Sequence, residues 1–237
     1  MFSLIVPAHN EAKTLLPTLQ ALANQPPELA YEIVVACNGC DDDTPALARA
    51  FAAQNKPAQI RVVESEKAGM SWGKNFGAEN SRGEILVFID ADTRLPPTAL
   101  AEIARSLAGK ERVIGTMAGA PDRGGPVVRV GFTVANWFTR RQKVHAPGGV
   151  MVMHRAVWEQ CRFDENLPQG TSSDLIMRAR GGGAEYVFIG RVKAITSIRR
   201  FEKTGIVGQM LAWRKNHQDL RRHRRAAVAG REYENVR

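Results

Sequence analysis

The chain has 237 residues, of which 44% are apolar and 24% are charged, a composition typical of a globular protein with one substantial core. It contains no apolar run near the roughly 18 residues of a membrane span, since the longest candidate, residues 126–138, is short and carries Arg129. The net charge of +9 is uneven, because residues 191–237 hold 13 of the 33 Lys and Arg but four of the 24 Asp and Glu.

The first half of the chain predicts strands alternating with helices. Apolar runs rich in β-branched residues predict strands over residues 2–6, 32–36, 60–63 and 85–89. Amphipathic segments predict helices over residues 12–24, 43–54, 71–80 and, after two prolines, 96–107. This alternation predicts right-handed βαβ units and an α/β fold with a mostly parallel central sheet and flanking helices.

The second half is less regular. It predicts helices over 126–143 and 174–180 and strands over 150–153, 185–189 and 192–197. Glycines predict turns or mobile loops around 119–126 and 181–183. Apolar residues recur at helical spacing after residue 205, which predicts a basic C-terminal helix. We therefore expect one α/β domain over residues 1–200 and a basic helical extension over 201–237.

Cysteine usage and the N-terminus predict a cytoplasmic protein. No basic segment precedes an apolar run and cleavage site, so we expect no signal peptide. Three cysteines, an odd number, are typical of a reducing compartment. The basic cluster at Arg221–Arg225 is typical of contact with nucleic acid, anionic lipid or a phosphorylated ligand, and a solvated helix end is the plain alternative.

Two carboxylates, Asp90 and Asp92, directly follow the apolar run at residues 85–89. Like charges in a half-buried place repel each other and lose hydration, so the pair is costly without a positive partner. One interpretation is a turn or a helix cap. The other is a divalent metal, Mg²⁺ or Mn²⁺, that also binds a phosphate-bearing substrate.

Polar loops also follow the other three predicted strands, where ligands bind in open α/β sheets. The loops read "PAHNEAKT", "CNGCDDDT" and "ESEKAGMSWGKNFGAENSRG". Lys67 and Lys74 would offset phosphate charge, Gly69 would permit close backbone approach, and the first two loops would hold a nucleobase. No P-loop and no G-x-G-x-x-G occurs, so ATPase and dinucleotide-binding interpretations have little support.

Four blocks in order, "LIVPAHNEAKTL", "IVVACNGCDDDT", "KAGMSWGKNFGAENSRGEILVFIDADT" and "GGVMVMHRAVWEQCRFDENL", resemble the family 2 glycosyltransferases of the GT-A fold. The resemblance covers roughly residues 2–180, and its most specific part is the Asp-x-Asp (DXD) motif. It implies a nucleotide-diphosphate-sugar donor, a divalent metal, and inversion at the anomeric carbon of the sugar.

The resemblance also assigns roles to matching positions. The residues that it places on the donor are Pro7, Ala8, Glu11, Asn38, Lys67, Gly69, Asn75 and Asp90. It places Asp92 on the metal with Asp90 nearby, and Gly148 and Gly149 on the acceptor side. His217 is a further candidate metal ligand, with a solvated helix histidine as the alternative.

The chain departs from the family pattern in two places. Asn38 stands where many members carry a uracil-binding Asp, so the base of the nucleotide stays open. Thr171 and Ser172 stand where many members carry Glu-Asp, while Asp174 and Arg178 keep the pattern on the acceptor side. Asp174 is the candidate catalytic base, with a role in the first turn of a helix as its alternative. If Asp174 points away, the acceptor is itself acidic, a phosphate or carboxylate that needs no base.

The leading hypothesis is therefore a metal-dependent glycosyltransferase that uses an acceptor hydroxyl. We expect the acceptor to be lipid-linked or anionic, with peripheral membrane contact at the inner face through the basic C-terminal helix; nucleic acid is a less favoured partner. The alternatives are a nucleotidyltransferase and a catalytically inactive nucleotide- or nucleic-acid-binding module of the same fold.

Overall fold

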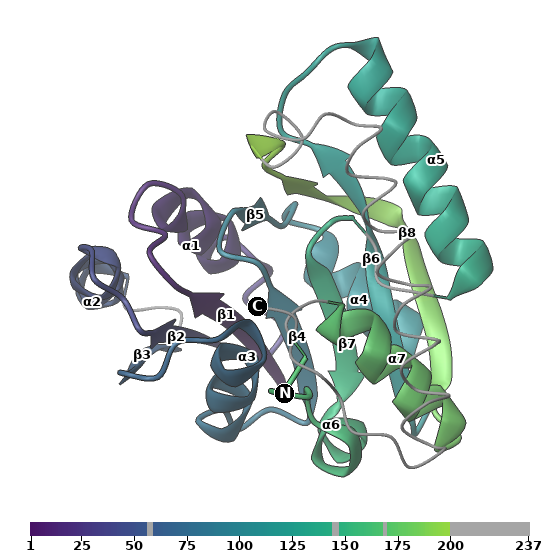
Figure 1. Ribbon diagram of the computed structural model, residues 1–237, viewed down its shortest axis with the longest axis horizontal. Helices are drawn as coiled ribbons and strands as arrows, with labels where there is room; N and C mark the ends of the chain where they lie inside the picture. Colours follow the sequence, from purple (N-terminus) through teal and green to yellow (C-terminus); the bar gives the residue numbers. More distant parts are fainter. Residues whose placement is uncertain (56–58, 144–146, 168–169, 200–237) are drawn as a thin grey trace.

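A sheet of eight strands organises the residues described by the computed structural model, which are 1–55, 59–143, 147–167 and 170–199 (Figure 1). The strands are β1 (Phe2–Ala8), β2 (Tyr31–Asn38), β3 (Gln59–Ser65), β4 (Ile85–Ile89), β5 (Thr93–Arg94), β6 (Val113–Pro121), β7 (Val150–His154) and β8 (Glu185–Thr196). Their spatial order is β3-β2-β1-β4-β7-β6-β8-β5.

Because of their directions, most strands of this sheet end at the same edge. Strands β1 to β4 are parallel, β7 runs antiparallel between β4 and β6, and β6 is parallel to β8. The carboxyl ends of β1, β2, β3, β4, β6 and β8 therefore lie at the same edge, together with the start of β7.

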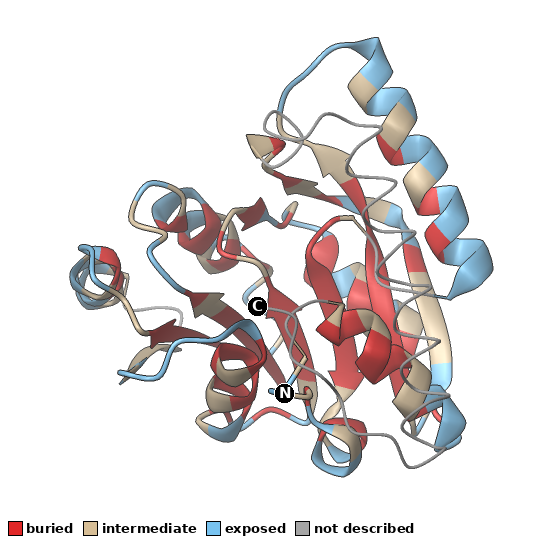
Figure 2. Ribbon diagram, viewed as in Figure 1, coloured by how far each residue is buried: buried red, intermediate tan, exposed pale blue. Residues whose placement is uncertain are grey.

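Helices cover both faces of the sheet. The helices are α1 (Leu15–Ala23), α2 (Thr44–Gln54), α3 (Met70–Glu79), α4 (Ala99–Leu107), α5 (Pro126–Gln142), α6 (Arg155–Cys161) and α7 (Thr171–Gly181). Apolar residues of α1, α2 and α4 join the core on one face, and those of α3, α6 and α7 join the core on the other. Figure 2 shows the buried residues concentrated along the strands and on the helix faces turned to them. The predicted α/β fold with a mostly parallel sheet is confirmed.

The second half differs from the prediction in three elements. Strand β6 and helix α6 were not predicted, and the two strands expected after residue 184 form the single strand β8. The prediction of a turn at Gly119–Pro121 is wrong, since these residues end β6. Small residues lower strand propensity there, but a Cβ on Gly119 would lie 2.6 Å from the Cα of Gly148, so this strand needs them.

Helix α1 begins at Leu15 rather than at the predicted residue 12. The backbone amide of Glu11 instead donates to the side chain of Thr44, the first residue of α2, and that of Ala12 donates to the side chain of Asp42 in the loop after β2. These bonds hold the preceding turn against that loop and leave it outside the helix.

The predicted basic extension over residues 201–237 lies outside the described residues, and so does His217. Within the described ranges, no helix is long and apolar enough to cross a membrane.

Candidate active site

The loops after β1, β2, β4 and β8 are joined at the carboxyl edge of the sheet. The Asp41 amide donates to Asn10 Oδ1 (2.8 Å), which joins the loop after β2 to the loop after β1. The Ser197 amide donates to the Asp92 carbonyl (3.2 Å), which joins the loop after β8 to the loop after β4. The contact of Arg199 with Glu11 joins these two pairs, so segments 188 residues apart in the chain form one site.

Arg199 lies between two carboxylates of this site. Its Nη2 is 2.5 Å from Glu11 Oε1, and its Nε is 3.2 Å from Asp92 Oδ2. The hydrogen bond to Glu11 is the main cause that raises the pKa of the Arg199 guanidinium, so the group remains a cation. Arg199 therefore offsets the repulsion between the carboxylates of Glu11 and Asp92.

Arg199 was not singled out from the sequence, where it counted only toward the basic surplus of residues 191–237. Its role depends on β8 ending at the same edge as β4. Two adjacent arginines, Arg199 and Arg200, follow a predicted strand, which was the available signal for a site residue. The order of the strands, which brings Arg199 to Asp92, could not be predicted.

Asp90 is hydrogen-bonded to Gly149, the residue that precedes β7. Its amide donates to the Gly149 carbonyl (3.0 Å), and its own carbonyl accepts from the Thr93 amide (3.0 Å). Gly149 has a φ of +65°, and a Cβ there would lie 2.7 Å from Asp90 Oδ2. Gly149 is therefore needed both for its backbone conformation and for the space that the Asp90 carboxylate occupies.

We expect Gly149→Ala to lower kcat/KM for sugar transfer by about 10²-fold, because the new methyl group would displace the Asp90 carboxylate. Gly109→Ala is the matched control, since Gly109 also has a positive φ (+72°) but its Cβ would meet no atom within 4 Å. Both variants should lose roughly 1–2 kcal/mol of unfolding free energy from backbone strain. Equal activity losses in the two variants would contradict a specific contact with Asp90.

Asn38, at the end of β2, ties the end of β1 to the loop after β3. Its Nδ2 donates to the Ala8 carbonyl (3.1 Å), and its Oδ1 accepts from the Gly69 amide (3.0 Å). Asn38 and Ala8 are buried, and Pro7 pairs with β2 beside them. The structure thus brings together four of the residues predicted to bind the donor, with the Asn38 amide engaged by backbone.

Two other predicted donor ligands contact the segment between α6 and α7. Lys67 Nζ is 2.7 Å from Glu165 Oε2 and lies 4.0 Å from the centre of the Trp72 ring. Asn75 is buried, and its Nδ2 donates to the Phe163 carbonyl (2.9 Å) and to Glu165 Oε1 (3.0 Å). These contacts attach α3 to that segment.

Asp174 lies inside the protein. Its side chain is 1% exposed, and its Oδ2 accepts from Arg178 Nε (2.8 Å) across one helical turn. Ser172, next to it in α7, accepts from the buried Lys74 Nζ (3.2 Å). Burial lowers the pKa of Arg178. Here Asp174, Ser172 and Lys74 form part of the packing between α3 and α7.

Asp90 and Asp92 are the described residues best placed to hold a metal. No group of three or more His, Cys, Asp or Glu side chains with metal-binding geometry occurs in the described ranges. Mg²⁺ and Mn²⁺ do not require one, since Mg²⁺ is usually bound through one or two carboxylates with water and substrate phosphates. The two carboxylates therefore offer the oxygen ligands that such a metal takes.

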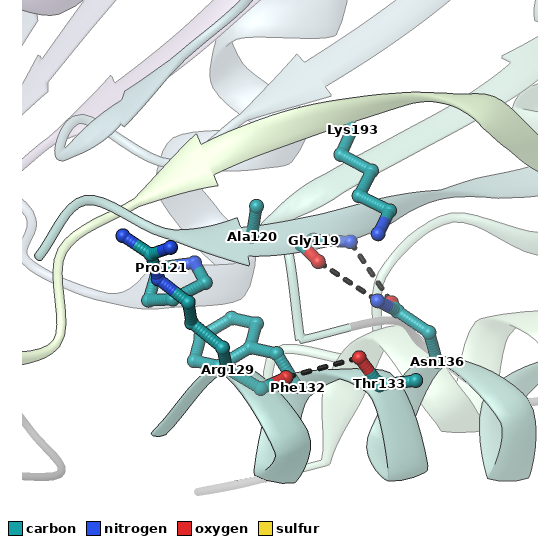
Figure 3. Close-up of a pocket in the computed structure, with 8 residues that line it drawn as sticks. All are labelled: Gly119, Ala120, Pro121, Arg129, Phe132, Thr133, Asn136 and Lys193. Atoms are coloured by element: carbon teal, nitrogen blue, oxygen red, sulfur yellow. Dashed lines mark hydrogen bonds between the residues drawn. The ribbon is translucent and has the colours of Figure 1, made fainter. Parts of the chain in front are cut away.

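A pocket of about 270 Å³ lies between β6, β8 and α5 (Figure 3). It is lined by Gly119, Ala120, Pro121, Arg129, Phe132, Thr133, Asn136 and Lys193. Gly119 contacts Gly148 on its other side, and Gly148 precedes Gly149. The pocket thus has two cationic side chains, has no carboxylate in its lining, and adjoins the glycines next to Asp90.

The chain matches the family described as "Glycosyl transferase family 2" over residues 3–161. Glycosyltransferase AglD of Haloferax volcanii is 27% identical over 195 residues, which cover 76% of this chain and 31% of AglD. Dolichyl-phosphate beta-glucosyltransferase of Drosophila melanogaster is 31% identical over 112 residues, which cover 43% of this chain and 34% of the enzyme. The matches span about a third of these curated relatives.

The fold is also that of solved glycosyltransferases of the GT-A type. Mannosyltransferase PcManGT from Pyrobaculum calidifontis, solved in complex with GDP-Man and Mn²⁺, superposes with a TM-score of 0.75. The two proteins are 21% identical, and the match covers 98% of this chain and 65% of the mannosyltransferase. The expected GT-A fold is confirmed.

Proposed function

Because the chain belongs to glycosyltransferase family 2, we propose that it transfers a sugar from a nucleotide-diphosphate sugar to an acceptor oxygen, with inversion at the anomeric carbon. The observation that carries this proposal is the arrangement of Glu11, Asp90, Asp92 and Arg199 at one sheet edge. Carboxylates for a metal and a cation for phosphate are what a diphosphate leaving group requires.

Asp92 and Asp90 would hold a divalent metal, Mg²⁺ or Mn²⁺, against the donor diphosphate. When bound, the metal supplies positive charge that stabilises the leaving diphosphate. Arg199, which lies 3.2 Å from Asp92, is positioned to turn from the carboxylate to a phosphate oxygen. Gly149 keeps the Asp90 carboxylate in place during transfer.

The loops after β1 and β2 would hold the nucleoside, with Pro7, Ala8, Glu11 and Asn38 as the predicted contacts, and Gly69 would lie near the donor. The buried Asn38 amide is bonded to backbone on both sides, so it shapes the loops that face the base. Lys67, Lys74 and Asn75 support that region through α3.

We propose an acceptor whose attacking oxygen is already ionised, a phosphate or carboxylate. Asp174 is the predicted base, but its buried carboxylate is engaged by Arg178 and so is not presented to an acceptor. The pocket beside Gly119 supports an anionic acceptor, because Arg129 and Lys193 line it. The relative from Drosophila, named for dolichyl phosphate, also supports a lipid-linked phosphate.

Thermal-shift binding of UDP-, GDP- and TDP-sugars, with Mn²⁺ or with EDTA, tests the donor site. We expect donors with one particular nucleotide base to raise the melting temperature in Mn²⁺ and not in EDTA, since Asp90 and Asp92 would hold the donor diphosphate only with a metal bound. No shift with any donor would contradict the proposal. Product analysis separates the alternatives: a nucleotidyltransferase makes a sugar nucleotide, and an inactive module binds a donor without turnover.

A further inference from the structure

Helix α5 presents an apolar face to solvent. The side chains of Val127, Val130, Val134, Trp137 and Phe138 are between 45% and 73% exposed. Their spacing of three or four residues places them on one stripe of the helix. The other large apolar side chains that are exposed in the described ranges are Met1, Leu16 and Met70, which do not adjoin one another in sequence. The stripe therefore marks an interaction surface.

The opposite side of α5 is attached to the sheet. Asn136 is buried, and its amide group accepts from the Gly119 amide (2.9 Å) and donates to the Gly119 carbonyl (2.8 Å). Phe132 and Thr139 are buried on the same side, and Figure 1 shows α5 at the rim of the molecule beside β6. Because α5 is anchored through Phe132, Asn136 and Thr139, its apolar stripe faces outward.

The charges of α5 are all positive. Arg129, Arg140 and Arg141 lie in the helix and Lys143 follows it, while no Asp or Glu occurs from residue 124 to residue 143. An outward apolar stripe with Trp and Phe beside basic residues is the pattern of helices that lie in the interface of anionic bilayers.

The pocket at one side of α5 adds a place for a lipid phosphate. Arg129 from α5 and Lys193 from β8 line it from different elements, as Figure 3 shows. No carboxylate is among its lining residues. Gly119, which lines the pocket, lies against Gly148, and the next residue, Gly149, lies against the Asp90 carboxylate.

We propose that α5 docks on an anionic lipid bilayer, with its apolar stripe in the headgroup region and its basic side chains on lipid phosphates. The positive charge of α5 favours an anionic bilayer over the C-terminal segment of this chain or a second copy of it as the occupant of this surface. The C-terminal residues 201–237 carry nine Lys and Arg against four Asp and Glu, and a second copy would oppose α5 with the same basic helix. Docking needs no turnover, so it goes beyond the proposed glycosyl transfer.

Vesicle co-sedimentation of the full chain tests docking. We expect binding to phosphatidylcholine vesicles with about 30 mol% phosphatidylglycerol, weak binding to pure phosphatidylcholine, and loss of most binding in about 0.5 M salt. Val130→Ser with Trp137→Ser should weaken the partition roughly tenfold or more, because apolar burial is lost. Arg140→Gln with Arg141→Gln, exposed positions that leave packing intact, should weaken it roughly tenfold.

Two controls separate α5 from other surfaces. Leu16→Ser removes an exposed apolar side chain from α1 and should leave binding unchanged. Arg→Gln changes at Arg221, Arg222, Arg224 and Arg225 in the full chain should leave the dependence on α5 intact. The proposal is overturned if the wild type ignores anionic vesicles or if only the tail variant loses binding. It is also overturned if gel filtration shows that Val130→Ser with Trp137→Ser dissociates a dimer.

Discussion

Asp92→Asn is expected to lower kcat/KM for sugar transfer by about 10²–10³-fold, the loss typical of removing one preorganised electrostatic contact to a developing charge. The carboxylate of Asp92 would hold the metal, and a neutral amide holds a divalent cation less tightly. The measurement is the initial rate of nucleotide diphosphate release with the donor selected by thermal shift. The donor-induced rise in melting temperature should fall with the rate.

The fold of the Asp92→Asn variant should be unaffected, because Arg199 keeps its contact with Glu11. We expect the free energy of unfolding to change by less than about 1 kcal/mol. Glu111→Gln is the control, since it neutralises an exposed carboxylate at the start of β6. Full activity of Asp92→Asn would rule out Asp92 as a metal ligand needed for transfer.

Asp174→Ala is expected to lower the free energy of unfolding by about 3–5 kcal/mol, because it leaves the Arg178 guanidinium without its carboxylate in a largely buried place. Arg178 Nε lies 2.8 Å from Asp174 Oδ2, and the Asp174 side chain is 1% exposed. Urea denaturation followed by circular dichroism measures the loss. Glu79→Ala removes the exposed partner of Arg162 and should cost less than about 1 kcal/mol.

The variant Asp174→Asn separates a structural role from a catalytic one. An amide oxygen still accepts from Arg178, so we expect near-normal kcat per folded molecule together with some loss of stability. A general base cannot be replaced by an amide. A kcat reduced by about 10²-fold or more, with stability retained, would therefore restore Asp174 as the base and argue for a hydroxyl acceptor.

The alternation of strands and helices in the first half was predictable because it is local. Strand β4 has the predicted bounds, and β1, β2 and β3 extend the predicted strands by two or three residues. Continuous β-branched runs and helical periodicity are properties of neighbouring residues, so one sequence shows them. Strand β6 was missed because it is stabilised by pairing with β7 and β8, and its glycines lower its local propensity.

In the candidate site, too, some residues could be identified from local sequence, while their contacts depend on the tertiary structure. Asp90 and Asp92 were identifiable because both follow one apolar strand in the sequence. Asn38, Lys67 and Asn75 were identified by position, but their contacts with Ala8 and Glu165 depend on packing between distant segments. The burial of Asp174 depends on how α7 packs against α6, β6 and β8, which no local pattern indicates.

The sequence by itself determined the fold class, the family and the pair of carboxylates at a strand end, because these follow from local patterns of polarity and spacing. The tertiary structure alone decided that Arg199 joins Glu11 to Asp92 and that Gly149 supports Asp90. It also decided that the apolar stripe of α5 faces outward. Each of these depends on strand order and packing direction, which set the neighbours of a side chain across the sheet rather than along the chain.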